Sequence, residues 1–264
     1  MSGISNTLQS VRYGQPFTPF ALGGGSAVTR WLRFDQTSST YSSVTDLRGG
    51  TAATQSTSGQ RPAGATLNGF PAATFDGSDD VLSEPILAAN NGTARRGCWF
   101  WFKPSTASGI HTLVGCDTNA GASASSVLIR QNGTSLLVDV YLGAFSIRRL
   151  TITSAFANGV AHSYSWEEDL GQASEADQCT VWIDGVKQTG TFTNDTGTPN
   201  GQPAALIAPT GTYAIGALSQ AGASGAAGTY GRNFLWLAGA GGFSGGGLLS
   251  AADRALLQAY EPAA

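Results

Sequence analysis

The segment Cys179-Thr-Val-Trp-Ile-Asp-Gly-Val-Lys-Gln-Thr-Gly190 indicates the fold of the chain. It consists of an alternating run, the pair Asp184-Gly185 and a second alternating run. An Asp-Gly pair between two such runs favours a type I′ turn, because both central residues of that turn need a positive φ. The segment therefore predicts a β-hairpin in which Trp182 faces Lys187, away from the core. The residues predicted on the core face are Val181, Ile183 and Val186.

Many other short strands, separated by Gly-rich turns, surround this hairpin. The run Cys98–Phe102 is apolar on both faces, which is typical of a central strand in a covered sheet. His111–Gly115 is the predicted antiparallel mate, across the loop 104–109. Ser250 and Asp253 resemble a capping box that begins a C-terminal helix. Together these elements predict an all-β fold, a two-sheet antiparallel sandwich with one short terminal helix.

The chain is predicted to contain one domain. Residues 1–30 carry Pro16, Pro19 and the run Gly23–Ser26, and they lack sustained periodicity, so we expect an extended N-terminal arm. Residues 31–264 show no repeat and no sign of a second core, so we expect a single sandwich there.

The charge content of the chain indicates which kinds of binding partner to expect. Charged residues make up 12% of the chain, well below the usual figure of about 25%, and the net charge is −3. We therefore expect no nucleic-acid partner. A surface so poor in charge suits a protein packed against neighbours, as a homo-oligomer or as part of a larger assembly. We expect no membrane span, because no run of 18 apolar residues occurs, and no secretory signal, because the first residues lack a basic and an apolar region.

Three cysteines are too few for a disulfide framework and do not have metal-binding spacing. They are predicted to be reduced, buried thiols in a protein made in a cytoplasm. If the predicted strand pair holds, Cys98 and Cys116 lie nearly opposite each other. Two free thiols are expected there, and a disulfide is the geometric alternative.

Two sets of residues are candidate binding sites. Asp76, Asp79 and Asp80 lie in one turn and offer oxygen ligands for Ca²⁺; the alternative is a tight turn in which the carboxylates cap backbone N–H groups. Sugars stack on exposed aromatic faces, so a ring row on an outer sheet surface could bind a glycan or a partner. The alternative for these rings is burial in the core. The ring row comprises Trp99, Trp101 and Trp182.

No catalytic residue is predicted. Retaining glycosidases need two carboxylates about 5–5.5 Å apart. Here Glu167 and Asp169 begin a carboxylate pattern, but Gly171 and Gln172 occupy the positions of the second Glu. We interpret residues 167–177 as a solvated acidic loop and expect the protein not to be an enzyme.

Several anchors occur in an order that resembles a known family. The chain resembles the concanavalin A-like jelly roll, specifically the laminin-G-like domains of bacterial and bacteriophage surface proteins. The resemblance covers roughly residues 30 to 260 and is carried by the anchors Asp46–Gly50, Arg61-Pro62, Asn68–Leu82, Trp99–Phe102, Ala161–Tyr164, Val181–Gly185 and Leu249–Tyr260.

The resemblance implies a jelly-roll sandwich and a place in a phage virion. It implies a non-enzymatic structural protein on a capsid or tail surface, held to other virion proteins through residues 1–30. The first alternative is a glycan-binding lectin or host-adhesion module, and the second is a glycosidase. No cofactor is expected other than the possible Ca²⁺.

Overall fold

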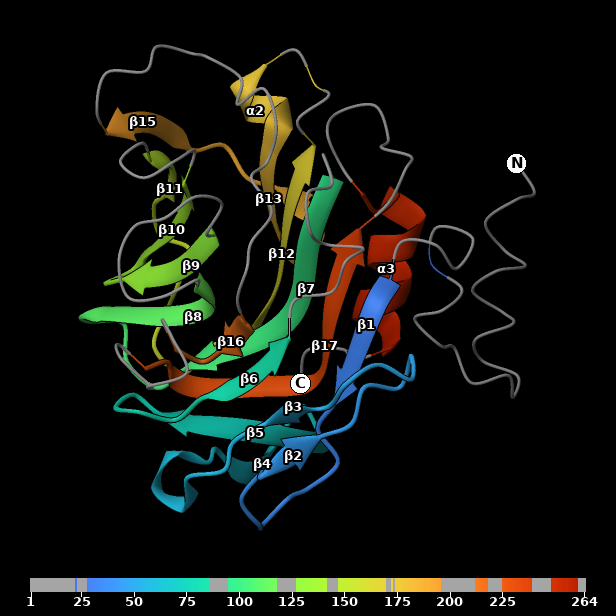
Figure 1. The fold of residues 1–264 in the computed structure, drawn as a ribbon. Helices are drawn as coiled ribbons and strands as arrows, with labels where there is room; N and C mark the ends of the chain where they lie inside the picture. The colour runs from blue at the N-terminus through green and yellow to red at the C-terminus, as the bar shows by residue number, and fades with distance from the viewer. Residues whose placement is uncertain are drawn as a thin grey trace.

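A computed structural model shows two antiparallel β-sheets packed face to face (Figure 1). It describes residues 22, 28–85, 95–117, 127–141, 147–169, 172, 174–195, 212–217, 225–238 and 248–260. This arrangement confirms the predicted all-β jelly-roll sandwich with one short C-terminal helix.

Within these residues, one sheet has eight strands. The central strand β17 (Ala227–Ala238) pairs with β7 (Arg95–Pro104) on one side, with a register shift between Tyr230 and Phe234; on its other side it pairs first with β5 (Phe70–Asp76) and then with β1 (Val28–Arg33). The remaining order across the sheet is β14 (Val186–Lys187), β13 (Cys179–Ile183), β12 (His162–Asp169), β7 (Arg95–Pro104), β17 (Ala227–Ala238), β5 (Phe70–Asp76) and β4 (Ala63–Leu67).

The second sheet has nine strands in the described part of the chain. Its order is β15 (Thr191–Asp195), β11 (Ile147–Ile152), β10 (Ser135–Tyr141), β9 (Val127–Asn132), β8 (Ile110–Asp117), β16 (Thr212–Ile215), β6 (Leu82–Pro85), β3 (Ala53–Thr54) and β2 (Ser43–Val44). The short 3-10 helix η2 (Ser58–Gln60) follows β3, and the short helix α2 (Glu175–Gln178) precedes β13.

The main core lies between the two sheets. Side chains of β7, β12 and β17 meet those of β8 to β11 there, including the stacked rings of Phe100 and Phe234 at 5.3 Å. A second apolar cluster lies on the outer face of the eight-stranded sheet, where helix α3 (Ala251–Tyr260) covers it. Figure 1 shows α3 in red beside β17 and β1, on the side away from β8 to β11. Covering on both faces explains why β7 is apolar on both faces.

The predicted hairpin is present in the predicted register. Trp182 pairs with Lys187, and Asp184 and Gly185 have φ values of 51° and 77°, as a type I′ turn requires. Val181 and Ile183 do pack on the main core, but Val186 is 62% exposed. The core-face prediction was therefore wrong for Val186, because β14 is the edge strand and the nine-stranded sheet does not cover it.

The predicted mate of the strand at Cys98–Phe102 was wrong. Residues 111–115 belong to β8, which pairs with β9 and β16 in the other sheet. The neighbours of β7 are β12 and β17, so Cys98 lies opposite Trp166 and Trp236. Cys98 is a buried free thiol, whereas the side chain of Cys116 lies outside the described residues.

Most of the predicted arm, residues 1–30, also lies outside the described residues. The described part is ordered into the domain: Leu22 is fully buried in the outer cluster, and β1 already begins at Val28. Among the helices that the structure describes, none has the length and apolar character needed to cross a membrane.

Candidate functional site

A polar groove lies at one end of the nine-stranded sheet, over β3 and β6. It is open to solvent and has a volume of about 650 Å³. Strand β3 pairs with β6 through Thr54 and Ser83, which places both side chains on the outer face of the sheet. The groove is rich in hydroxyl and amide groups, among them Ser42, Thr54, Gln55, Ser56, Ser83 and Thr212.

A buried ion pair supports the groove from below. Arg30 of β1 bonds Glu84 at 2.5 Å, and both side chains are almost fully buried. The same guanidinium donates to the carbonyl oxygens of Thr51 and Pro85, which line the groove. Trp236 donates its indole N–H to Glu84 from the opposite sheet. Burial raises the pKa of Glu84 to about 7, against the lowering effect of the Arg30 charge.

One wall of the groove is held by Arg61, part of the Arg61-Pro62 anchor. Its Nε donates to the carbonyl of Gln55 at 3.0 Å, and one Nη donates to the carbonyl of Ser56 at 2.7 Å. The side-chain oxygen Oε1 of Gln55 accepts the N–H of Thr57 at 2.9 Å, so side chains of the wall itself hold its backbone in place. A groove of preset shape lined by hydroxyls and amides can bind a ligand with many hydroxyl groups.

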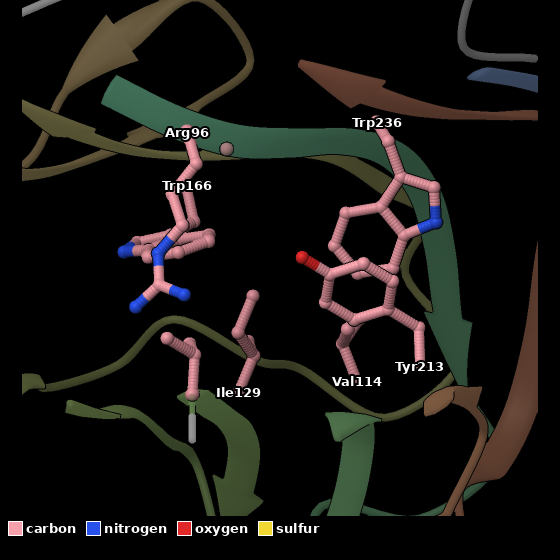
Figure 2. Close-up of a pocket in the computed structure, with 8 residues that line it drawn as sticks. Arg96, Val114, Ile129, Trp166, Tyr213 and Trp236 are labelled. Carbon is pink, nitrogen blue, oxygen red and sulfur yellow. The ribbon is translucent and has the colours of Figure 1, made fainter. Parts of the chain in front are cut away.

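A second, much smaller cavity lies inside the sandwich. Figure 2 shows Arg96 and Trp166 on one side of it and the stacked rings of Tyr213 and Trp236 on the other. Its volume is about 10 Å³, room for one water molecule at most. Arg96 is buried there and bonds Glu168 at 2.8 Å. This cavity belongs to the core and has no room for an organic ligand.

The structure corrects the prediction that Trp99 and Trp101 could form a binding surface. Their exposed fractions are 2% and 3%, since α3 covers them through Leu257 and its neighbours. Trp182 lies on the same face and is half-buried, with the guanidinium of Arg254 only 3.8 Å from its ring centroid. The cation occupies the ring face that a sugar would need.

The prediction of a solvated acidic loop at residues 167–177 was wrong for residues 167–169, whereas the side chain of Asp177 at the other end is 40% exposed. Glu167, Glu168 and Asp169 are the last residues of β12, and all three are fully buried. Glu167 bonds Arg254 and accepts the N–H groups of Leu248 and Leu249. A carboxylate without access to solvent and with every oxygen bonded has no free face toward a substrate.

The structure does bring Asp76, Asp79 and Asp80 together, in the turn that carries the chain from one sheet to the other. One oxygen of each lies within 4.8 Å of the others. The turn also satisfies itself: Asp80 accepts the N–H of Asp76 at 2.9 Å, and Asp76 accepts that of Ser78 at 2.8 Å. Burial, opposed by the Asp76 N–H bond, raises the pKa of Asp80 to about 6.

His162, at the start of β12, is half-buried. Its Nδ1 lies 2.6 Å from an oxygen of Asp184 in the hairpin turn. The residues of the groove were not singled out from the sequence, apart from Arg61. The sequence carries only a weak signal for the groove residues. Ser, Thr and Gln abound throughout the chain, and the groove joins segments that are distant in sequence.

No family model and no curated protein matches the chain. Solved structures do match. A Trypanosoma rangeli sialidase in complex with sialic acid has a TM-score of 0.57 and 14% identity, over 91% of this chain and 33% of that one. Domain 4 of AbnA, an extracellular arabinanase from Geobacillus stearothermophilus, in complex with arabinotriose, has a TM-score of 0.53 and 14% identity, over 88% and 98%.

The ligand-binding domain of botulinum neurotoxin serotype D, in complex with N-acetylneuraminic acid, also matches. Its TM-score is 0.53 and its identity 10%, over 89% of this chain and 50% of that one. At such identities the similarity shows a shared β-sandwich fold. It agrees with the jelly-roll part of the predicted resemblance and provides no link to bacteriophage particles.

Proposed function

We propose that this chain is a glycan-binding β-sandwich domain whose site is the polar groove over β3 and β6. The observation that carries the proposal is the open groove of about 650 Å³, whose described lining is rich in hydroxyls and amides. That several structures of the same fold hold a saccharide supports it. The proposal takes the lectin alternative and moves its site away from the tryptophans.

The chemistry of the groove agrees with a saccharide ligand. A sugar presents many hydroxyl groups, each able to donate and accept, and Ser, Thr and Gln side chains do the same. The buried pair Arg30–Glu84 holds the groove floor in place before any ligand arrives. A preformed floor lowers the ordering cost of binding.

Binding to an array of bacterial and animal glycans tests the proposal. The variant Thr54→Trp fills the groove from an exposed position on β3. The matched control is Thr66→Trp, an exposed threonine on β4 at the edge of the other sheet.

We expect binding to fall at least tenfold in Thr54→Trp and to persist in Thr66→Trp. Equal binding by both variants would place the site elsewhere. Absence of binding to every glycan of the array would refute the function itself.

The virion role stays a prediction that is compatible with glycan binding. It includes the contact of residues 1–30 with other virion proteins, the location on a capsid or tail, and the absence of enzyme activity. Cross-linking and mass spectrometry of purified particles would test it.

Calcium binding at Asp76, Asp79 and Asp80 likewise stays a prediction. Its test is whether CaCl₂ raises the thermal midpoint of the wild type and whether this rise is lost in Asp79→Asn.

A further inference from the structure

The polar groove contains a positive charge that no carboxylate among the described residues neutralises. Of the described residues that line the groove, Arg61 and Glu84 are charged. The side chain of Glu84 is fully buried, and its carboxylate pairs with Arg30. Arg61 instead donates to two backbone carbonyl oxygens, those of Gln55 and Ser56. A carbonyl accepts a hydrogen bond but carries no net charge, so the charge of Arg61 stays uncompensated.

This situation is unusual for an arginine of this protein. In the described part of the chain, most arginines pair with an aspartate or a glutamate. The pairing holds for buried arginines such as Arg254 with Glu167, and also for the partly exposed Arg33 with Asp35. The chain thus neutralises its arginines internally as a rule, and Arg61 departs from that rule inside the candidate site.

The backbone bonds fix the Arg61 guanidinium and leave one of its edges available. A guanidinium has five N–H donors. The edge formed by Nε and Nη2 donates to the wall, at 3.0 Å to Gln55 and 2.7 Å to Ser56. Nη1 makes no hydrogen bond with the described residues and is not among their buried unpaired nitrogens, so it is open to solvent. The edge formed by Nη1 and Nη2 can therefore donate two parallel bonds to a ligand.

We infer that the groove binds an acidic saccharide, whose carboxylate pairs with Arg61. Two parallel N–H donors match the two oxygens of a carboxylate, and such charge-assisted bonds are about twice as strong as neutral ones. Because the guanidinium is already held by the wall, little side-chain freedom is lost on binding. The hydroxyls and amides of the groove bind the rest of the sugar. The inference rests on the proposed function and adds the class of saccharide.

A new charge beside Arg61 tests the inference while the arginine keeps its hold on the wall. Ser56 is exposed and lines the groove, and its carbonyl accepts from Arg61. Ser56→Glu places a carboxylate next to the guanidinium, and Ser56→Gln adds a side chain of similar size without charge. Thr193→Glu is the control, an exposed threonine on β15 at the opposite edge of the same sheet.

The ligands are saccharides that differ only in charge. Oligogalacturonate, oligomannuronate and sialyllactose are each paired with the methyl ester of the same saccharide. Calorimetry measures the affinities of the wild type and the three variants. Circular dichroism and the thermal midpoint check that each variant folds.

We expect at least one acid to bind the wild type tenfold or more tightly than its ester. Relative to Ser56→Gln, Ser56→Glu should lose about tenfold in affinity for the acid and nothing for the ester. Thr193→Glu should bind the acid as the wild type does. Binding of the acid should weaken as NaCl rises, and binding of the ester should not.

Equal affinity of the wild type for every acid and its ester would overturn the inference. Equal binding of the acid by Ser56→Glu and Ser56→Gln would do the same. So would displacement of the acid by acetate as efficiently as by monomeric galacturonate, since the hydroxyls and amides would then take no part. If neutral glycans still bind and Thr54→Trp blocks them, the proposed function survives this failure. If no saccharide of either kind binds, both fall.

Discussion

At the scale of single residues, the three carboxylates that end β12 show how this chain uses its few charges. Alternation along the strand sends Glu167 to the outer face, where it meets Arg254, and Glu168 to the inner face, where it meets Arg96. Asp169 pairs with Arg95, its register partner on β7. Each buried anion thus joins two elements of the fold.

Replacing Glu167 by Gln should destabilise the protein by about 3–5 kcal/mol, because the buried Arg254 guanidinium would lose its anion. The side chains of this pair are 0% and 4% exposed. Chemical denaturation followed by circular dichroism measures the change in the free energy of unfolding.

Asp177→Asn is the control for that experiment. Its pair with Lys187 is exposed, with a distance of 2.9 Å, and exposed pairs contribute about 0–1 kcal/mol. A loss below about 1 kcal/mol in Glu167→Gln would contradict the structural role assigned to this carboxylate.

The error made for residues 167–169 has a physical origin. A run of Glu and Asp before a hairpin is usually solvated, and the arginines that neutralise this one come from β7, β11 and α3. Those partners lie 20 to 87 residues away along the chain. No local pattern in the sequence reports such pairings.

At the scale of elements, prediction succeeded where the signal is local. The turn at Asp184-Gly185 needs positive φ at two positions, and those residue types supply it. The capping box is also formed, with Asp253 N–H to Ser250 Oγ at 3.1 Å and Ser250 N–H to Asp253 Oδ2 at 3.1 Å. The pairing of β7 with β8 failed, because a jelly-roll chain passes between sheets and consecutive strands need not be neighbours.

Helix α3 seals the tryptophan face of the eight-stranded sheet mainly through one apolar side chain. Leu257 is fully buried in the outer cluster with Trp99 and Trp101, so Leu257→Ala should destabilise the protein by about 2–5 kcal/mol. Tryptophan fluorescence should shift to longer wavelength as water reaches these rings. Denaturation and emission spectra measure both effects.

The neighbouring leucine provides the comparison for that variant. Leu256 is only half-buried and lies outside the outer cluster. Leu256→Ala should lower the free energy of unfolding by less than Leu257→Ala does, and it should leave the tryptophan emission spectrum unchanged. Equal losses for the two variants would mean that α3 does not cover the tryptophans as described.

At the scale of the whole molecule, two raised carboxyl pKa values predict how stability depends on pH. Burial raises the pKa of Asp80 from 3.8 to about 6 and that of Glu84 from 4.5 to about 7. A raised value in the folded state means that the stability contributed by these groups is full below pH 4 and is lost as pH rises through 6 and 7. The thermal midpoint should therefore fall by a few degrees between pH 5 and pH 8.

Calorimetric scans between pH 5 and pH 8 measure how the thermal midpoint changes with pH. Asp80→Asn removes one of the two groups and keeps an acceptor for the Asp76 N–H, so its slope between pH 5 and pH 6.5 should be flatter than that of the wild type. A midpoint that rises toward pH 8 would contradict the prediction.

The architecture as a whole was accessible from the sequence, and the candidate site was not. Alternation and turn chemistry are local and predict a sandwich. The groove depends on Arg30, Arg61 and Glu84, brought together from three separate strands and loops. Aromatic residues drew attention to Trp99 and Trp101, whose burial follows from a helix some 150 residues later in the chain.

The position of β17 has a consequence for how the protein is made. This strand is completed only at Ala238, yet it lies in the middle of the eight-stranded sheet and pairs with β1, which begins at Val28. During synthesis on a ribosome, the edge of β7 that pairs with β17 stays unpaired until nearly all strands have been synthesised. Sheet closure is then a late event dominated by contacts between distant residues, which makes folding slow and the nascent chain dependent on protection from aggregation.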